Sequence, residues 1–360
     1  GLIRFFSALV LFVFYTIYIS AAVVRIGLVL NTLFGIDYII SVIFGVVIVV
    51  PYVFIGGFLT LAWIDLFQGI FLMFVILIVP LYLLPSVGGI DGIWTAIHTK
   101  GLTSSLFPNF KPITICEMFF VLIGWGLGYF GQPHIITKFM GINRVSEIRK
   151  AQAVGMSWMT IALGSATLVG LVGIPFFLTK GLADSSEVFI QMVKQSFPPF
   201  LVGLMLCAVF AATINAMSSM VLVLSSSLAE DLYKRVFNKK ASSKELLLVS
   251  RFGVILVSVI AFAIAVGKIS TIYGLVFYAW SGLGASFGPL LLMCLYGRNI
   301  NKYGAICGII VGGVVAAAWP LLDNVLPLAI PPLPPAFVAS FLSMWVVSYA
   351  TRRRAASLAT

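Results

Sequence analysis

The chain has 360 residues, of which 61% are hydrophobic and 9% are charged, and its mean hydropathy is +1.14. A soluble domain of this length cannot bury so large an apolar fraction, so the composition predicts a membrane protein surrounded mostly by lipid. The net charge of +11 would favour nucleic acid as the partner of a soluble protein. Here most Lys and Arg residues fall in connections on one predicted side of the membrane, so the charge reports orientation and no nucleic-acid partner is expected.

Ten apolar runs reach about 18 residues or more, the length that crosses the hydrocarbon core as a helix. They are predicted at residues 3–30, 38–58, 64–85, 113–137, 151–178, 198–228, 246–267, 272–296, 303–322 and 334–351. An even number of spans places Arg4 and the run Arg352–Arg354 on the same, cytoplasmic side. The sequence therefore predicts an all-α protein with a single transmembrane domain over 1–360, a non-cytoplasmic loop at 86–112 and a cytoplasmic tail at 352–360.

Two of the first three spans carry a polar residue of interest. Tyr18 lies in a stretch of hydroxyl-bearing residues; such groups in a membrane commonly form hydrogen bonds between helices, and a place in a binding pocket is the alternative. Asp65 opens the third span, where an acid can complement the helix dipole. Ionisable groups near membrane depth are costly and often functional, so Asp65 is also the best-placed acid for a cation or a proton.

The most unusual stretch is Gly124–His134, within the fourth span, with four glycines and a proline. Gly costs about 1 kcal/mol and Pro about 3 kcal/mol relative to Ala in a helix interior, so a broken helix is predicted here. Loosened backbone at membrane depth persists only where protein buries it or where it lines a wet cavity, which favours a substrate path. The alternative is that the glycines only allow neighbouring helices to pack closely.

The letters Gly126 to Gly131 also fit G-x-G-x-x-G, a dinucleotide-binding pattern when it follows a strand in a βαβ unit. An apolar membrane span does not provide that context, so the dinucleotide interpretation is set aside. No cofactor is expected, and no nucleophile, base and acid gather in one segment, so an enzyme is not predicted. The four cysteines lie far apart in apolar segments without metal-ligand spacing and are interpreted as small core residues.

The sixth span carries a second polar group of residues. Helical spacing places Ala212, Asn215 and Ser219 on one face, with Ser218 beside it. Small side chains and oxygen ligands suit a hard cation such as sodium, and polar contacts between helices are the alternative. In the eighth span, Gly284 and Gly288 predict close helix packing, and no ligand is assigned there.

Three stretches together resemble the sodium/solute symporter family, and within it the sodium/proline symporter branch. The first is Gly124–Ile136 and the third is Tyr278–Pro289. The second is Ala211–Ala212 of the sixth span, with the later Ser225–Ser226 and Glu230–Lys234. The resemblance runs from the first span to the last. It implies an inverted-repeat fold of the kind shared with neurotransmitter/sodium symporters, working by alternating access. It also implies that about three helices of such a transporter are absent before Gly1.

Carried over by position, the resemblance implies roles for two sets of residues. Tyr18, Trp125, Tyr129, Gln132 and Pro133 match positions around the substrate. Ala212 matches a backbone-carbonyl sodium ligand, while Asn215 and Ala216 stand where the family usually has a Ser/Thr pair. Ser218 and Ser219, with Asp65, match positions where some relatives hold a second cation. The expected cation ligands are therefore Asp65, Ala212, Asn215, Ser218 and Ser219, although Ala216 departs from the family pattern because its side chain has no oxygen.

The function implied is uptake of a small amino acid, most simply proline, coupled to sodium across the cell membrane. The alternatives are proton coupling through Asp65, another solute carried by the same family, and the membrane sensor module of a signalling protein. A passive channel is disfavoured, because Trp125 and Tyr129 crowd the broken stretch and no ring of charges or carbonyls lines it.

Overall fold

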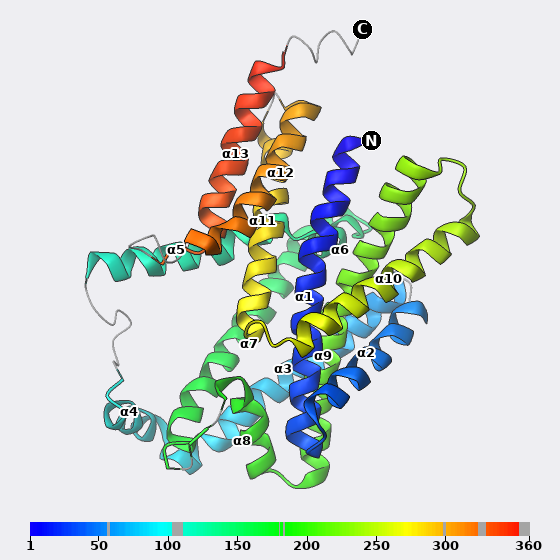
Figure 1. Ribbon diagram of the computed structural model, residues 1–360. Coiled ribbons are helices and arrows are strands. Elements are labelled where there is room, and N and C mark those ends of the chain that lie inside the picture. The colour runs from blue at the N-terminus through cyan, green and yellow to red at the C-terminus, as the bar shows by residue number, and fades with distance from the viewer. Residues whose placement is uncertain are drawn as a thin grey trace. The chain divides into compact units, whose positions relative to one another are not determined.

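The computed structural model describes residues 1–55, 58–102, 111–179, 181–182, 184–297, 300–322 and 329–352, with backbone only for 48–55 and 58–61. These residues form helices and no strand (Figure 1). The long helices are α1 (Leu2–Phe34), α2 (Tyr38–Ile55), α3 (Phe58–Leu83), α5 (Pro112–Gly128), α7 (Ile148–Phe176), α9 (Pro199–Ser226), α10 (Ser243–Val266), α11 (Ile272–Tyr296), α12 (Lys302–Ala318) and α13 (Leu333–Ala350). Shorter elements are α4 (Gly89–Thr99), α6 (Pro133–Met140), α8 (Val188–Ser196) and the π-helical η5 (Ser227–Phe237).

The long helices confirm the all-α prediction and correspond one to one with the ten predicted spans. Within the described part of the chain, nine helical stretches are long and apolar enough to cross a membrane. The tenth is α2, whose side chains are described only to Val47. Large apolar side chains stand exposed on the helices, among them Phe67 at 68% and Leu122 at 70%. An apolar outer surface of this kind is what a lipid solvent allows.

The chain forms two compact units, each of which is internally packed. One comprises Gly1–Ala21, Phe110–Gly141 and Ser219–Thr360, and the other comprises Ala22–Asn109 and Ile142–Ser218. Helices α1 and α9 each continue from one unit into the other. We call them the first and second units.

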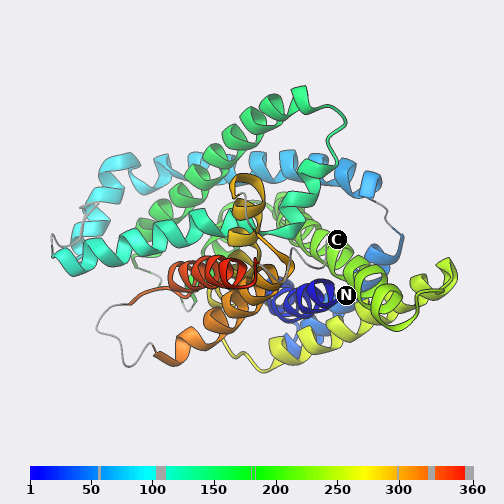
Figure 2. The same cartoon turned by 90° about the horizontal axis from the view of Figure 1, so that it is seen from above.

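In the first unit, α11, α12 and α13 pack against one another, and Figures 1 and 2 show α12 and α13 side by side. Small residues make this approach possible: a Cβ added to Gly304 of α12 would lie 2.6 Å from the Met344 carbonyl oxygen of α13. The Ser340 hydroxyl of α13 donates to the Gly308 carbonyl of α12 at 2.8 Å. Close packing of small residues and a polar contact between helices are the usual means of holding membrane helices together.

In the second unit, the core lies where α3 packs on α7 and α8 joins them. Val79, Val172 and Met192, one from each of these helices, have no exposed surface. Trp158 of α7 also donates its indole N–H to the Gly69 carbonyl of α3 at 3.3 Å. The second unit therefore places α3, which carries Asp65, against α7.

The predicted loop at 86–112 is partly helical, since the 3-10 turn η1 (Pro85–Val87) is followed by α4. Ile93, Ala96 and Ile97 of α4 are buried, and α4 packs on α7. Residues 103–110 of this connection and 353–360 of the predicted tail lie outside the described residues. The expectation that all four cysteines are core residues is wrong, because Cys207 and Cys294 are exposed. Cysteine is apolar enough to face lipid, so an apolar segment does not distinguish the two positions.

Candidate functional site

The fourth predicted span is broken, as its glycines and proline predict. Helix α5 ends at Gly128, a single 3-10 turn, η2, covers Tyr129–Gly131, and Gln132 is extended with φ −90° and ψ 102°. Pro133 then occupies the first turn of α6, where its missing N–H costs nothing. We call residues 128–133 the break. It leaves carbonyls at the end of α5 and N–H groups at the start of α6 without partners inside their helices.

The glycines of the break also pack closely against α11, so the alternative interpretation of these residues holds as well. A Cβ added to Gly131 would lie 2.6 Å from the Gly284 Cα and 2.7 Å from the Gly288 backbone nitrogen. A Cβ on Gly128 would overlap the Trp280 indole nitrogen. The same glycines thus loosen the helix and bring the break against α11.

Trp280 of α11, which is 4% exposed, is the centre of an aromatic cluster. Its ring centroid lies 4.8 Å from that of Tyr129, edge to face, and 5.5 Å from that of Trp125. Tyr18 of α1 packs against the same hydrophobic cluster as Trp125. Three of the predicted substrate residues are therefore gathered around Trp280, to which the sequence analysis assigned no role.

Gln132 is fully buried, and its amide is only half satisfied. The Nε2 group donates to the Gly128 carbonyl at 3.3 Å and to the Trp280 carbonyl at 3.2 Å. The Oε1 atom is buried and accepts no hydrogen bond within the described part of the chain. Since an unpaired buried acceptor costs about 1–3 kcal/mol, Gln132 Oε1 is a strong candidate for a ligand N–H group.

Tyr15 and His134 form a contact that sequence reasoning missed. The Tyr15 hydroxyl accepts the His134 backbone N–H at 3.0 Å and lies 3.2 Å from His134 Nδ1. The ring of Tyr18, one turn further along α1, meets the His134 ring edge to face at 6.1 Å. Because the His134 N–H lies in the first turn of α6, Tyr15 satisfies one of the groups that the break leaves without a partner.

The predicted cation residues lie on two helices. Asp65, Ala212, Asn215 and Ser218 belong to the second unit, and Ser219 follows Ser218 in α9. Helix α3 begins at Phe58, so Asp65 is two turns inside it and the dipole interpretation is wrong. The sequence signal for that start is the pair Gly56 and Gly57, which directly precedes Phe58.

On α9, the described side chains have different surroundings. Ser218 donates its hydroxyl to the Ile214 carbonyl at 2.7 Å, and Ser219 is 8% exposed. Asn215 is half-buried and Ala216 is exposed. Helix α9 runs without interruption through Ala212. The carbonyl of Ala212 therefore accepts a hydrogen bond within the helix, and a cation bound to it would share this oxygen with a backbone N–H.

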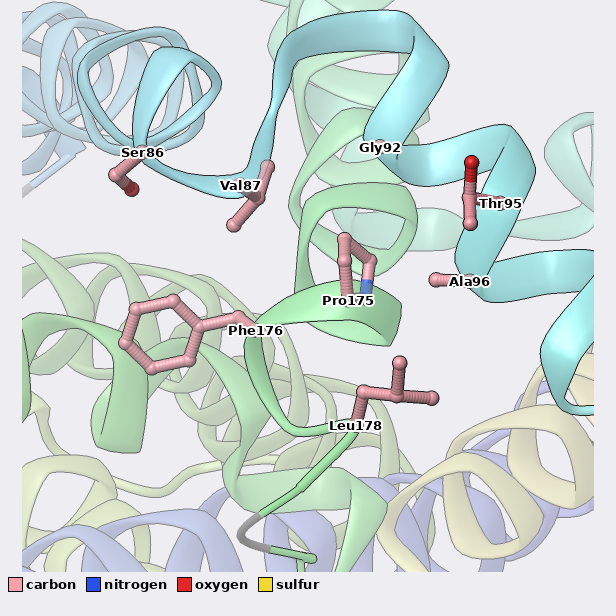
Figure 3. A pocket seen from close by; sticks show the side chains of 8 residues that line it. All are labelled: Ser86, Val87, Gly92, Thr95, Ala96, Pro175, Phe176 and Leu178. Atoms are coloured by element: carbon pink, nitrogen blue, oxygen red, sulfur yellow. The ribbon is translucent and has the colours of Figure 1, made fainter.

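A separate hollow of about 580 Å³ lies in the second unit, between the connection from η1 to α4 and the end of α7 (Figure 3). Its two hydroxyls are engaged locally, Ser86 donating to the Leu83 carbonyl and Thr95 to the Asp91 carbonyl. The remaining lining is mostly apolar, with Val87, Pro175 and Leu178 around the opening in Figure 3. None of the predicted site residues lines it, and no role is assigned to it.

A membrane helix interrupted beside aromatic residues, here gathered around the buried Trp280, is typical of secondary transporters. Comparison with known proteins agrees. The model of the "Sodium:solute symporter family" matches residues 1–312. The chain belongs to the sodium:solute symporter family and is a multi-pass membrane transporter.

Individual relatives match most of the chain. The high-affinity proline transporter PutP of Bacillus subtilis is 39% identical over 356 residues, which is 98% of this chain and 74% of PutP. The sodium/proline symporter of Escherichia coli is 35% identical over 88% of this chain and 64% of its own length. A solved structure of a Na⁺-coupled sialic acid symporter, outward-open and substrate-bound, has a TM-score of 0.77 at 17% identity and covers 96% of this chain and 73% of that one. The last likeness establishes the fold.

Proposed function

We propose that this protein takes up proline by symport with sodium. Membership of a solute symporter family gives the class of activity. The proline transporters and sodium/proline symporters among its relatives support proline as the solute and sodium as the coupling ion. The proposed substrate residues are Tyr18, Trp125, Tyr129, Gln132 and Pro133.

The observation that carries this proposal is the unpaired Oε1 of Gln132 beside an aromatic cluster. Proline at neutral pH carries a secondary ammonium group with two N–H donors on an apolar ring. Gln132 Oε1 would accept one N–H, and the faces of Trp125 and Tyr129 would attract the cationic nitrogen while contacting the ring methylenes. Pro133 would keep the backbone extended at Gln132.

Sodium is proposed to bind oxygens of Asp65, Ala212, Asn215, Ser218 and Ser219. Coupling requires that the cation favour the substrate-binding state by differential affinity, which is typically about 1–3 kcal/mol. The exposed methyl of Ala216 offers no ligand, so Asn215 would have to supply the side-chain oxygen expected at this turn.

The test is uptake of radiolabelled proline into proteoliposomes containing the full-length protein, at fixed pH and with the membrane potential clamped. Uptake is expected with an inward sodium gradient and absent when choline replaces sodium. Direct uptake of other radiolabelled amino acids and organic acids identifies the solute if proline is not carried. Proline uptake that is equally fast in choline contradicts sodium coupling.

The runner-up is proton coupling through Asp65, favoured by the missing oxygen at Ala216 and by the position of Asp65 inside α3. In that case uptake follows an inward proton gradient without sodium, and Asp65→Asn abolishes the pH dependence. Under sodium coupling, Asp65→Asn instead raises the sodium concentration needed for half-maximal uptake.

A further inference from the structure

Trp280 lies opposite the break and bonds to it from another part of the chain. Its indole N–H donates to the Trp125 carbonyl at 3.4 Å, across 155 residues of sequence. Trp125 is one of the last four residues of α5, and the carbonyls of these residues accept no N–H from within the helix. The side chain of Trp280 therefore satisfies a carbonyl that the break sets free.

The backbone of Trp280 makes a second contact with the same segment. Its carbonyl accepts the Gln132 amide at 3.2 Å, while the same amide also reaches the Gly128 carbonyl at the end of α5. With Nε2 held by two carbonyls, Oε1 is fixed as the end of the amide that remains unpaired. The orientation of Gln132 is thus set by α11 and by α5 together.

Packing around Trp280 holds the groups that form these hydrogen bonds in place. The Trp280 ring rests against Gly128, where even a methyl group would overlap it, and lies edge to face with Tyr129. Gly284, one turn along α11, lets the backbone of the break come close enough for this contact. Rotation of the Trp280 side chain would release Trp125 and Tyr129, and withdrawal of its backbone would release Gln132 as well.

We propose that Trp280 is a positioning residue that sets affinity for the solute by holding Trp125, Tyr129 and Gln132 in their binding arrangement. This rests on the proposed function of the break as the substrate site. Trp280 acts through those residues, so its loss weakens solute binding while leaving sodium binding unchanged. A purely structural role would lower both together with the amount of folded protein.

The test compares Trp280→Phe with Trp345→Phe, a matched change at an exposed position of α13, where Trp345 is 59% exposed. The Phe variant keeps an aromatic side chain at position 280 but removes the indole N–H and the five-membered-ring atoms that lie against Gly128. Loss of the hydrogen bond alone predicts an increase in the dissociation constant for proline of about three- to tenfold, and the lost packing adds to it. Sodium binding measured without proline, and the maximal uptake rate at saturating proline, are expected to stay within about twofold of wild type.

Hydrogen exchange supplies a second measurement that needs no solute. In W280F, peptides covering Tyr129–Ile136 are expected to exchange faster in ligand-free protein, while peptides of the second unit do not change. If W280F does not accumulate, Gly128→Ala provides the same displacement, because its methyl group overlaps the Trp280 indole nitrogen.

The outcomes separate the two proposals. Unchanged proline affinity and unchanged exchange in W280F, with wild type binding proline, overturn the role of Trp280 and leave the proposed function standing. No proline binding by wild type overturns the proposed function, and the exchange result then decides alone whether Trp280 holds the break. Equal effects of W280F and W345F also overturn the proposal.

Discussion

The contact between Gly131 and α11 leads to a sharp prediction for Gly131→Ala. The added methyl would lie 2.6 Å from the Gly284 Cα and 2.7 Å from the Gly284 carbonyl oxygen and the Gly288 nitrogen. Carbon atoms at rest lie about 3.5–4.0 Å apart, so the break and α11 must separate by roughly 1 Å. All three atoms are backbone, so no side-chain rotation relieves the overlap. Overpacking of this kind costs about 1–3 kcal/mol.

Gly126→Ala is the matched control, from the same run of glycines. A Cβ at Gly126 meets no atom within 4 Å, and the residue lies inside α5, where Ala is about 0.5–1 kcal/mol more favourable than Gly. The unfolding temperature of the purified protein in detergent should therefore be lower for Gly131→Ala and unchanged or higher for Gly126→Ala, each compared with wild type. Proline affinity should fall only in the first variant. Equal stabilities of the two variants would refute the close approach of the break to α11.

Three further predictions concern other contacts. Tyr15→Phe removes the hydroxyl that contacts the His134 backbone N–H and Nδ1 and should lower the free energy of unfolding by about 1–3 kcal/mol; unchanged thermal unfolding would show that the hydroxyl does not cap α6. Glu245→Ala removes the acceptor of the Tyr233 hydroxyl and half of a capping box at the start of α10. It should lower the unfolding temperature in the same assay, and an unfolding temperature equal to that of wild type would contradict this. Asn215→Ala should raise the sodium concentration for half-maximal uptake about tenfold, which corresponds to about 1.4 kcal/mol; sodium activation identical to wild type would remove Asn215 from the cation site.

The break is the part of the site that sequence could predict. Gly124–His134 combines residues that individually disfavour a helix, and their effect is local, so composition alone locates the interruption. The spans were predictable for the same reason, since length and hydropathy decide whether a helix crosses a membrane. The start of α3 was predicted too late, at residue 64, although Gly56 and Gly57 directly precede Phe58 and mark a boundary.

The partners of the break could not be predicted. Trp280 lies 155 residues from Trp125, and Tyr15 lies 119 residues from His134. Pairings at such separations depend on how helices pack, and helical periodicity does not specify them. The signal available was the pair Gly284 and Gly288, which indicated a close approach to α11 without naming the segment that approaches. Gln132 was assigned to the substrate site through the family resemblance, but its unpaired oxygen appears only in the structure.

The most direct test of the account is the position of bound proline in a structure of the full-length protein with proline and sodium. The proline nitrogen is expected within about 3 Å of Gln132 Oε1, with the proline ring against Trp125 and Tyr129. Proline bound elsewhere, with Gln132 Oε1 still unpaired, would contradict the claim that the break forms the substrate site.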